Sequence, residues 1–343
     1  MELWISNAGK NMKLNQSEEK IDIVILWVDG NDPNWLEEKN KYAKSRSGQA
    51  KNRFRDFGNL QYLFRGIEKY APWVNKVFFI TWGHLPNFLD VNNQKLEIVK
   101  HEDFIPREYL PTFSSNVIEM NLHRIKNLSS KFILFNDDLF ILRNLKKEDF
   151  FENGLPKDRY VEYLKKNCSK RHEIMKRNYL EIINKYFSKQ EFIKKNFSKV
   201  FNIKYGLNNF KTLGHVRNDK FEDFYSEHLT QAFLKSTFEE VWEKEWQRLD
   251  DACHNKFRAD NDIGNPICRY WQLLTGNFKP SRKMGKYYEI DDNNDKIISA
   301  IKNRKYKIIC INDAKIDVDF EKAKKEINIA FETIFKEKSS FEK

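Results

Sequence analysis

Two adjacent aspartates, Asp137 and Asp138, follow an unbroken apolar run in the middle of this 343-residue chain. The run from Phe132 to Phe135 is typical of a buried strand, and Asn136 separates it from the two acids. Two carboxylates at the end of such a strand carry a desolvation cost that a cation or several donors must offset. Mg²⁺ binds one or two carboxylates together with substrate phosphates. The three polar residues therefore predict a metal–phosphate site, with an ordinary Asn-Asp-Asp turn as the alternative.

Charged residues nearer the N-terminus could serve the same chemistry. Asp29 follows the apolar run 21–28 in a Gly-containing acidic turn, which is found in nucleotide sites and also in ordinary turns. Arg53, Arg55 and Asp56 lie in a polar stretch rich in Ser, Asn and Lys. Because arginine makes bidentate contacts to phosphate, this stretch is a candidate phosphate clamp, and a plain surface loop is the alternative.

Further polar candidates lie at expected helix starts and strand ends. Asn116 opens a helix carrying Ile118 and Ile125, where we expect a capping pair with Glu119 and backbone amides free to bind phosphate. Downstream, two dense polar clusters contain His215, and Arg258 with Asp262. The last expected strand, 305–311, ends in Asn312 and Asp313, which repeats the apolar-then-polar pattern of the central segment.

These residues need a scaffold that brings distant strand ends together. Strands are expected at 21–28, 77–81, 96–99, 132–135 and 305–311, and helices at 59–70, 116–125, 223–249 and 320–335. Strands alternating with helices predict an α/β fold with a mostly parallel sheet flanked by helices. Ligands of such sheets bind at the carboxyl ends of the strands, where the candidate acids lie.

The remaining segments predict the domain organisation. Residues 1–20 are polar and are expected to form a flexible arm, and the rest of the chain is long enough for one large domain or two ordinary ones. Within it, residues 157–211 are rich in Lys and Asn and predict a helical insertion, acting as a lid or as an acceptor-facing segment. Its basic amphipathic face is either solvated or lies on a membrane surface.

Composition excludes several classes of protein. The chain is 40% hydrophobic with 28 phenylalanines, which excludes a disordered chain. Its net charge of +11 suits anionic partners, but there is no nucleic-acid motif and we expect no nucleic-acid partner. Four scattered cysteines predict reduced thiols and a cytoplasmic location. There is no apolar run of about 18 residues, so no membrane-spanning helix is expected.

In combination, these segments resemble the four conserved regions of the Stealth family of sugar-phosphate transferases. That family includes bacterial capsular, exopolysaccharide and receptor polysaccharide phosphotransferases and the eukaryotic N-acetylglucosamine-1-phosphotransferase. The first region corresponds to residues 21–30, and the second runs from 53–58 through Asn116 to 135–138. The third corresponds to His215 together with 254–258 and Asp262, and the fourth to 308–313 together with 331–341. The resemblance implies that residues 21–341 are a Stealth-type catalytic domain with a Rossmann-like α/β core, in agreement with the strands and helices expected above.

The resemblance also implies an activity. A hexose 1-phosphate would pass from UDP-hexose or UDP-N-acetylhexosamine to a glycan hydroxyl, forming a phosphodiester in capsular or cell-surface polysaccharide. The acceptor could be lipid-linked, which would place the protein at the inner face of the membrane. A metal-dependent glycosyltransferase with the same donor and a non-catalytic glycan- or membrane-binding module are the alternatives.

The implied roles follow from phosphoryl-transfer chemistry, which is mostly positioning and charge stabilisation. Mg²⁺ or Mn²⁺ would be held by Asn136, Asp137 and Asp138, and His215 is expected to be the general base. The other expected catalytic and substrate-binding residues are Asp29, Arg258, Asp262, Arg53, Arg55, Asp56, Asn116 and Asn312.

Overall fold

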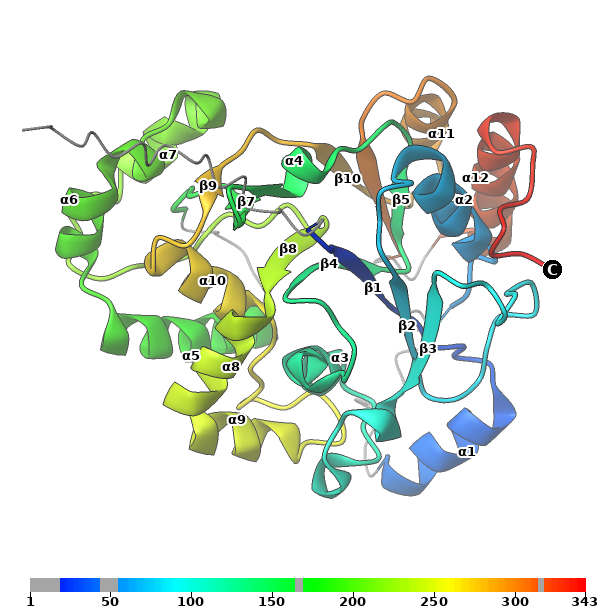
Figure 1. Ribbon diagram of the computed structural model, residues 1–343, viewed down its shortest axis with the longest axis horizontal. Helices are drawn as coiled ribbons and strands as arrows, with labels where there is room; N and C mark the ends of the chain where they lie inside the picture. Colours follow the sequence, from blue (N-terminus) through cyan, green and yellow to red (C-terminus); the bar gives the residue numbers. More distant parts are fainter. Residues whose placement is uncertain (1–18, 44–54, 164–168, 314–317) are drawn as a thin grey trace, which may run out of the picture.

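The computed structural model describes residues 19–43, 55–163, 169–313 and 318–343, and its centre is an open five-stranded sheet (Figure 1). The strand order is β3-β2-β1-β4-β8. The strands are β1 (Asp22–Leu26), β2 (Val77–Thr81), β3 (Leu96–Lys100), β4 (Lys131–Asn136) and β8 (Gln231–Leu234). The first four strands run parallel, and β8 runs antiparallel to β4. The predicted α/β fold with a mostly parallel sheet is therefore confirmed. Residues 1–18 of the expected arm lie outside the described residues.

Two small three-stranded sheets extend the central one. Their orders are β10-β11-β5 and β6-β7-β9. Their strands are β5 (Leu139–Ile141), β6 (Phe151–Glu152), β7 (Leu155–Asp158), β9 (Lys279–Pro280), β10 (Gly285–Glu289) and β11 (Ile308–Asn312). Strand β4 continues through a two-residue turn, Asp137–Asp138, into β5, which pairs antiparallel with β11. This turn therefore joins the central sheet to the sheet that contains Asn312.

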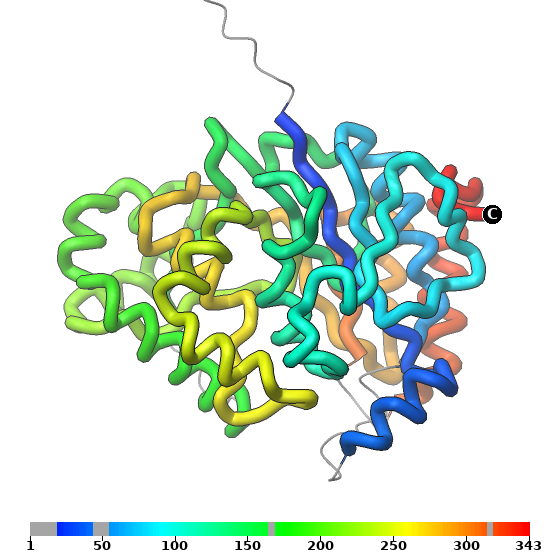
Figure 2. Tube along the Cα trace, turned by 60° about the horizontal axis from the view of Figure 1, so that its bottom comes forward, coloured from blue at the N-terminus to red at the C-terminus, as the bar shows by residue number. Residues whose placement is uncertain are grey.

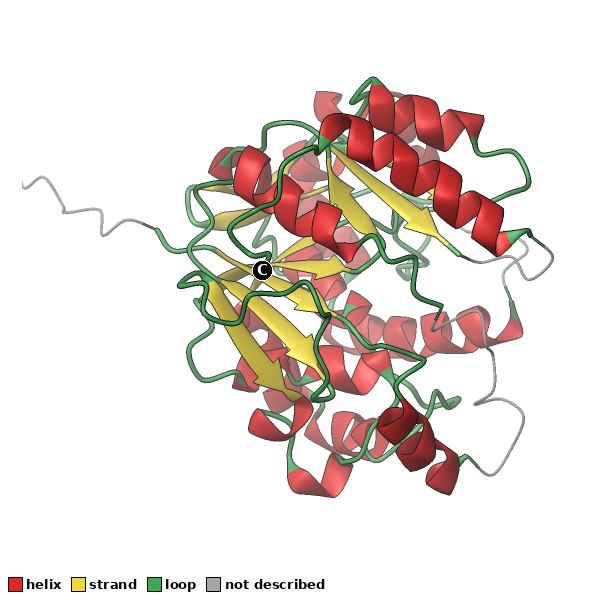
Figure 3. Ribbon diagram, turned by 90° about the vertical axis from the view of Figure 1, so that its right-hand side faces the viewer, coloured by secondary structure: helices red, strands yellow, loops and turns green. Residues whose placement is uncertain are grey.

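Helices cover both sides of the strands (Figure 3). They are α1 (Pro33–Tyr42), α2 (Leu60–Tyr70), α3 (Ser115–Met120), α4 (Lys147–Phe150), α5 (Lys170–Tyr186), α6 (Lys189–Val200), α7 (Asn209–Leu213), α8 (Lys235–Lys244), α9 (Trp246–Cys253), α10 (Pro266–Leu274), α11 (Asp295–Lys302) and α12 (Phe320–Ile334). No helix among the described ranges is long and apolar enough to cross a bilayer.

Alternate residues of the central strands enter two different hydrophobic cores. In β1, Ile23 and Ile25 pack in the core that contains α2 and α12, whereas Val24 packs in the core that contains α8 and α10. Because both faces are buried, the strand needs apolar residues at nearly every position. Gly66 lets α2 approach β5 closely, since a Cβ there would lie 2.8 Å from the carbonyl oxygen of Ile141.

Two expectations about local structure need correction. The segment 223–249 is not helical throughout, because it contains β8 before α8 begins at Lys235. The segment 157–211 begins as strand, since Lys157 and Asp158 belong to β7, and its helices start at Lys170. In the first segment, residues 231–234 form a strand because they pair with β4. The hydrophobic pattern of a four-residue edge strand is too short to be recognised from the local sequence.

Burial of His101 predicts acid sensitivity. This residue is 7% exposed, its Nδ1 atom has no hydrogen-bond partner among the described residues, and desolvation lowers its pKa to about 4, with His84 adding a smaller effect. Between pH 6.5 and 4 the unfolded chain binds a proton that the folded chain excludes. We expect this histidine to cost about 3 kcal/mol of unfolding free energy over that window, at 1.36 kcal/mol per pKa unit.

Urea unfolding at pH 7 and pH 4 measures this effect. The His101→Gln variant should lose less stability on acidification than the wild type, whereas the exposed control His254→Gln should behave like the wild type. An unchanged pH dependence in His101→Gln would contradict the expected linkage.

Candidate active site

A cleft of about 1270 Å³ opens where β1, β4 and β11 end, with helices α3, α5 and α10 along its walls. Several of the residues singled out from the sequence line it: Arg55, Asp56, Asn116, Asn136, Asp137, Asp138, Arg258 and Asn312. They come from segments more than 250 residues apart in the chain. Asn136, Asp137 and Asp138 reach the cleft from the carboxyl end of β4, where parallel sheets bind their ligands, and Asn312 reaches it from the end of β11 in the neighbouring sheet.

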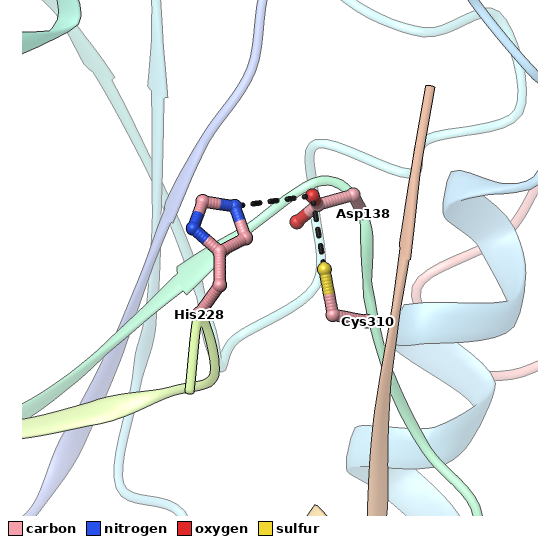
Figure 4. Close-up of side chains that lie close together, drawn as sticks. All are labelled: Asp138, His228 and Cys310. Carbon is pink, nitrogen blue, oxygen red and sulfur yellow. Dashed lines mark hydrogen bonds and ion pairs between the residues drawn. The ribbon is translucent and has the colours of Figure 1, made fainter. Parts of the chain in front are cut away.

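The turn between β4 and β5 is held from the neighbouring sheet. The backbone amide of Ile311 donates to the carbonyl oxygen of Asp138 at 2.8 Å, and the Cys310 thiol lies 3.2 Å from Asp138 Oδ2. His228 Nε2 lies 3.6 Å from the same carboxylate oxygen (Figure 4). Asp138 is therefore oriented by two elements that follow it in the chain by 90 residues or more.

The acids of this turn have the chemistry of a cation site. Asp138 Oδ1 is buried and has no hydrogen-bond partner among the described residues, which leaves a charged oxygen available to a metal. Desolvation by the surrounding protein and the charge of Asp138 raise the pKa of Asp137, and a backbone hydrogen bond opposes part of this rise. Burial, with Asp138 beside it, holds the pKa of Cys310 above its usual range, so the neutral thiol donates to Asp138. Carboxylate oxygens suit a divalent cation, and the ligand atoms of Asp138, His228 and Cys310 lie within 4.8 Å of one another, close enough to hold one.

His228 is a site residue that the sequence patterns do not reveal. It lies just before β8, lines the cleft, and has a positive φ of 49°, which is uncommon for a residue other than glycine. The centres of its ring and the Tyr287 ring lie 5.6 Å apart in an edge-on arrangement, and the contact with the Asp138 carboxylate raises the pKa of His228. Recognising 231–234 as a strand that pairs with β4 would have placed His228 at the same sheet edge as the acids.

Two of the four arginines that line the cleft are held in different ways. Arg55 makes two hydrogen bonds of 2.7 Å to Asp313 and stacks 4.5 Å from the ring centre of Phe320, so its guanidinium is held rigidly. Arg258 is exposed and donates to Ser115 Oγ at 3.3 Å. Arg258 can therefore reorient toward a bound anion, whereas Arg55 is a fixed part of the wall.

Asn116 and Asp262 form a buried pair beside the cleft. Asn116 Nδ2 donates to Asp262 Oδ2 at 3.0 Å, so Asn116 does not form the expected capping pair with Glu119. A Cβ at Gly264 would lie 2.6 Å from Asn116 Oδ1, which leaves room only for glycine there. Asp262 thus positions Asn116 by direct contact, and burial raises the pKa of Asp262.

Glu119 is a further acid on the cleft wall. Burial raises its pKa to about 7, and the charge of Arg258 opposes this rise. A carboxyl poised near neutrality in a cleft is typical of functional sites.

The remaining sequence candidates do not gather in the cleft. His215 is not among its lining residues: its ring pairs with Glu222, and its carbonyl oxygen accepts from buried Lys189 at 2.7 Å. The expectation that His215 reaches the acids is therefore not met. Asp29 also lies off the cleft lining, where its carboxylate accepts from the Asn31 amide in a turn. Arg53 lies outside the described residues.

Comparison with known proteins places the chain in a family. Stealth protein conserved region 1 matches residues 19–47, and conserved region 2 matches residues 53–158. The capsular polysaccharide phosphotransferase WcwK of Streptococcus pneumoniae is 47% identical over 332 residues, covering 95% of this chain and 98% of that protein. The exopolysaccharide phosphotransferase cps2G of Lactiplantibacillus plantarum is 36% identical over 326 residues, covering 94% and 96%.

The solved structure of the galactosyltransferase LgtC with donor and acceptor sugar analogs is only a weak match. It covers 90% of this chain and 95% of that chain at 9% identity, with a TM-score of 0.38, which is too low to support a conclusion. The full-length sequence matches and the two conserved regions show that the chain belongs to the Stealth family of polysaccharide phosphotransferases.

Proposed function

We propose that this enzyme transfers a hexose 1-phosphate from UDP-hexose or UDP-N-acetylhexosamine to a glycan hydroxyl, forming the phosphodiester of a capsular or other cell-surface polysaccharide. One observation carries the proposal: a single cleft gathers the acids of the β4–β5 turn, the cationic side chains of Arg55 and Arg258, and His228. These are the groups that phosphoryl transfer needs to bind a diphosphate, neutralise its charge and accept a proton. The relatives with similar sequences are named polysaccharide phosphotransferases.

The reaction exchanges one phosphorus–oxygen bond for another. The acceptor hydroxyl oxygen bonds to the β-phosphorus of the donor, the bond to the bridging oxygen breaks, and UMP leaves. Arg258 is placed to follow the charge that develops on the phosphoryl oxygens, because its side chain is exposed to the cleft and weakly held. Arg55, fixed by Asp313, would bind the donor without rearranging.

His228 is the proposed general base in place of His215. Its ring faces the cleft and its partner Asp138 would stabilise the imidazolium that forms when it accepts the acceptor proton. Asp137 and Asp138, with Asn136 adjacent, would hold Mg²⁺ or Mn²⁺, which supplies charge neutralisation for the diphosphate when bound. Helix α5, in the segment predicted as a lid or acceptor-facing insertion, forms one wall of the cleft and would contact the acceptor.

The proposed compartment is the cytoplasm. Its support is that the three described cysteines, Cys253, Cys268 and Cys310, are buried free thiols, as expected in a reducing environment. The proposed acceptor is a glycan that could be lipid-linked.

Product analysis tests the reaction type. The enzyme is incubated with a panel of UDP-sugars, a glycan acceptor and Mg²⁺ or Mn²⁺, and the released nucleotide is identified. Release of UMP with a new phosphodiester is expected. Release of UDP would instead identify a glycosyltransferase, and absence of turnover with every donor would favour a non-catalytic glycan- or membrane-binding module.

Arg258 provides a sharper test of charge stabilisation. Arg258→Ala should lower kcat/KM about 10²- to 10³-fold, the usual cost of removing one donor to a developing anion. Arg258→Lys should recover part of the loss, because it keeps the charge but not the bidentate geometry. Arg217→Ala, which also removes an exposed arginine but lies off the cleft lining, is the matched control and should remain within about twofold, as is usual for surface substitutions. Equal activity of Arg258→Ala and Arg217→Ala would remove Arg258 from the mechanism.

A further inference from the structure

The segment 197–213 turns large apolar side chains toward solvent. Phe197, Ile203, Leu207, Phe210 and Leu213, which we call the apolar tip, are 63%, 91%, 82%, 70% and 56% exposed. They are five of the nine large hydrophobic residues that are exposed in the part of the chain that the structure describes. Exposed apolar residues are ordinary when scattered, but a concentrated group of them marks an interaction surface.

The inner side of this segment is held by polar contacts. Asn209 Nδ2 donates to the carbonyl oxygens of Asn202 and Gly206 at 2.9 and 3.0 Å, and the buried Tyr205 hydroxyl donates to the Lys199 carbonyl oxygen at 2.8 Å. The segment is therefore braced from within by hydrogen bonds. Its apolar side chains contribute little to this bracing and remain available to a partner.

The apolar tip has a basic border. Between residues 190 and 213 the chain carries Lys194, Lys195, Lys199, Lys204 and Lys211 against the single acid Glu191. Lysine can bury its aliphatic stem in an apolar layer while its ammonium group stays in a polar one. Apolar residues framed by lysines are typical of segments that lie at a membrane surface.

A basic pocket of about 460 Å³ adjoins the apolar tip. Seven cationic side chains and one acid, Asp149, contribute to its lining; the cations are Arg143, Lys157, Lys204, Arg282, Lys283, Lys305 and Lys307. Lys204 donates to the Pro280 carbonyl oxygen at 3.0 Å and directly follows Ile203 of the apolar tip, so the chain passes from one surface to the other at this point. No carboxylate pairs with Arg143 or Arg282 among the described residues, which leaves uncompensated positive charge for an anionic partner.

We propose that the apolar tip and the basic pocket together dock this enzyme on an anionic lipid bilayer, with the apolar side chains entering the interface and the cations binding lipid phosphates. Helices α6 and α7 lie at the edge of the molecule opposite α12 in both Figure 1 and Figure 2, and the apolar tip is exposed there. None of the docking residues lines the catalytic cleft, which leaves the cleft free for substrate. The inference stands whichever donor the enzyme uses.

Vesicle co-sedimentation of the full chain tests the proposal. The wild type should sediment with vesicles of equal parts phosphatidylglycerol and phosphatidylcholine, and much less with pure phosphatidylcholine, because anionic lipid attracts the basic pocket. Leu207→Gln with Phe210→Gln should lower the partition coefficient at least about tenfold, since both lost side chains are largely exposed and would be buried only in the bilayer.

Two control variants make the outcome specific. Val91→Gln with Ile329→Gln also replaces two exposed apolar residues, which lie away from the apolar tip, and should bind vesicles like the wild type. Arg143→Gln with Arg282→Gln should lose roughly tenfold on anionic vesicles and little on neutral ones. All variants should keep the wild-type unfolding midpoint and turnover on a water-soluble acceptor.

Two results would overturn the proposal. One is that the wild type does not bind vesicles, or that the Leu207/Phe210 variant binds them as well as its Val91/Ile329 control does. The other is a wild-type dimer, measured by light scattering, that only the Leu207/Phe210 variant disrupts, which would make a second copy of the chain the occupant.

Discussion

Replacing Asp138 by asparagine is expected to lower kcat by about 10³-fold or more, because several catalytic contacts converge on this one carboxylate. It orients the ring of His228, it accepts from the Cys310 thiol, and its second oxygen is buried with no partner among the described residues. Asparagine keeps the size of the side chain but removes the charge that a cation and a protonated imidazole both require.

Metal titration separates this cause from misfolding. The Asp138→Asn variant should need a far higher Mn²⁺ concentration for half-maximal UMP release, while its unfolding midpoint stays close to that of the wild type. Asp219→Asn, an exposed aspartate off the cleft lining, should change turnover by less than about twofold. If Asp138→Asn retained a tenth of the wild-type turnover at ordinary metal concentration, the β4–β5 turn would not be the metal site.

Replacing Lys189 by methionine is expected to cost about 3–5 kcal/mol of unfolding free energy, the largest stability effect that we predict. The side chains of Lys189 and Glu162 are both 0% exposed and lie 2.8 Å apart. Lys189 also donates to the carbonyl oxygens of His215 and Lys220 at 2.7 and 3.2 Å. Its removal leaves a buried carboxylate and two backbone acceptors without their cation.

A double-mutant cycle identifies the buried charge as the cause. Adding Glu162→Gln to Lys189→Met should recover at least half of the loss in urea unfolding, because the amide removes the charge and still accepts from the Glu222 amide. The control Lys195→Met lies on the same helix with a side chain 75% exposed and should cost less than about 0.5 kcal/mol. If Lys189→Met lowered the unfolding free energy no more than Lys195→Met does, the Lys189–Glu162 pair would not stabilise the fold.

The buried Lys189–Glu162 pair also explains why His215 lies off the lining of the candidate active site. The sequence marks it as a histidine in a compact polar stretch, with nothing nearby to say which partner it meets. In the fold, Lys189 holds its carbonyl oxygen and Glu222 holds its ring. His228 reaches the acids instead. Strand β8 runs antiparallel to β4, so the residues just before β8 lie near the carboxyl end of β4.

The secondary structure was predicted well where the hydrophobic pattern is long and uninterrupted. Helix 59–70 and helix 320–335 are observed as α2 and α12 within one residue at each end, because their apolar stripes are complete. Strand β8 was missed because its four residues are a short edge pattern next to a strong helix.

Sequence alone determined the alternation of strands and helices, the acids at the end of the central apolar run, and membership of a phosphotransferase family, since all three depend on residue types at short spacing. Tertiary structure alone decided that Asp138 meets His228 and Cys310, that Arg55 is tied to Asp313, and that His215 is anchored elsewhere. These contacts join residues up to 258 positions apart, and their geometry depends on strand order and on which charges are buried together. Local sequence patterns reveal neither the strand order nor which charges are buried together, because both are set only when the sheets and helices pack.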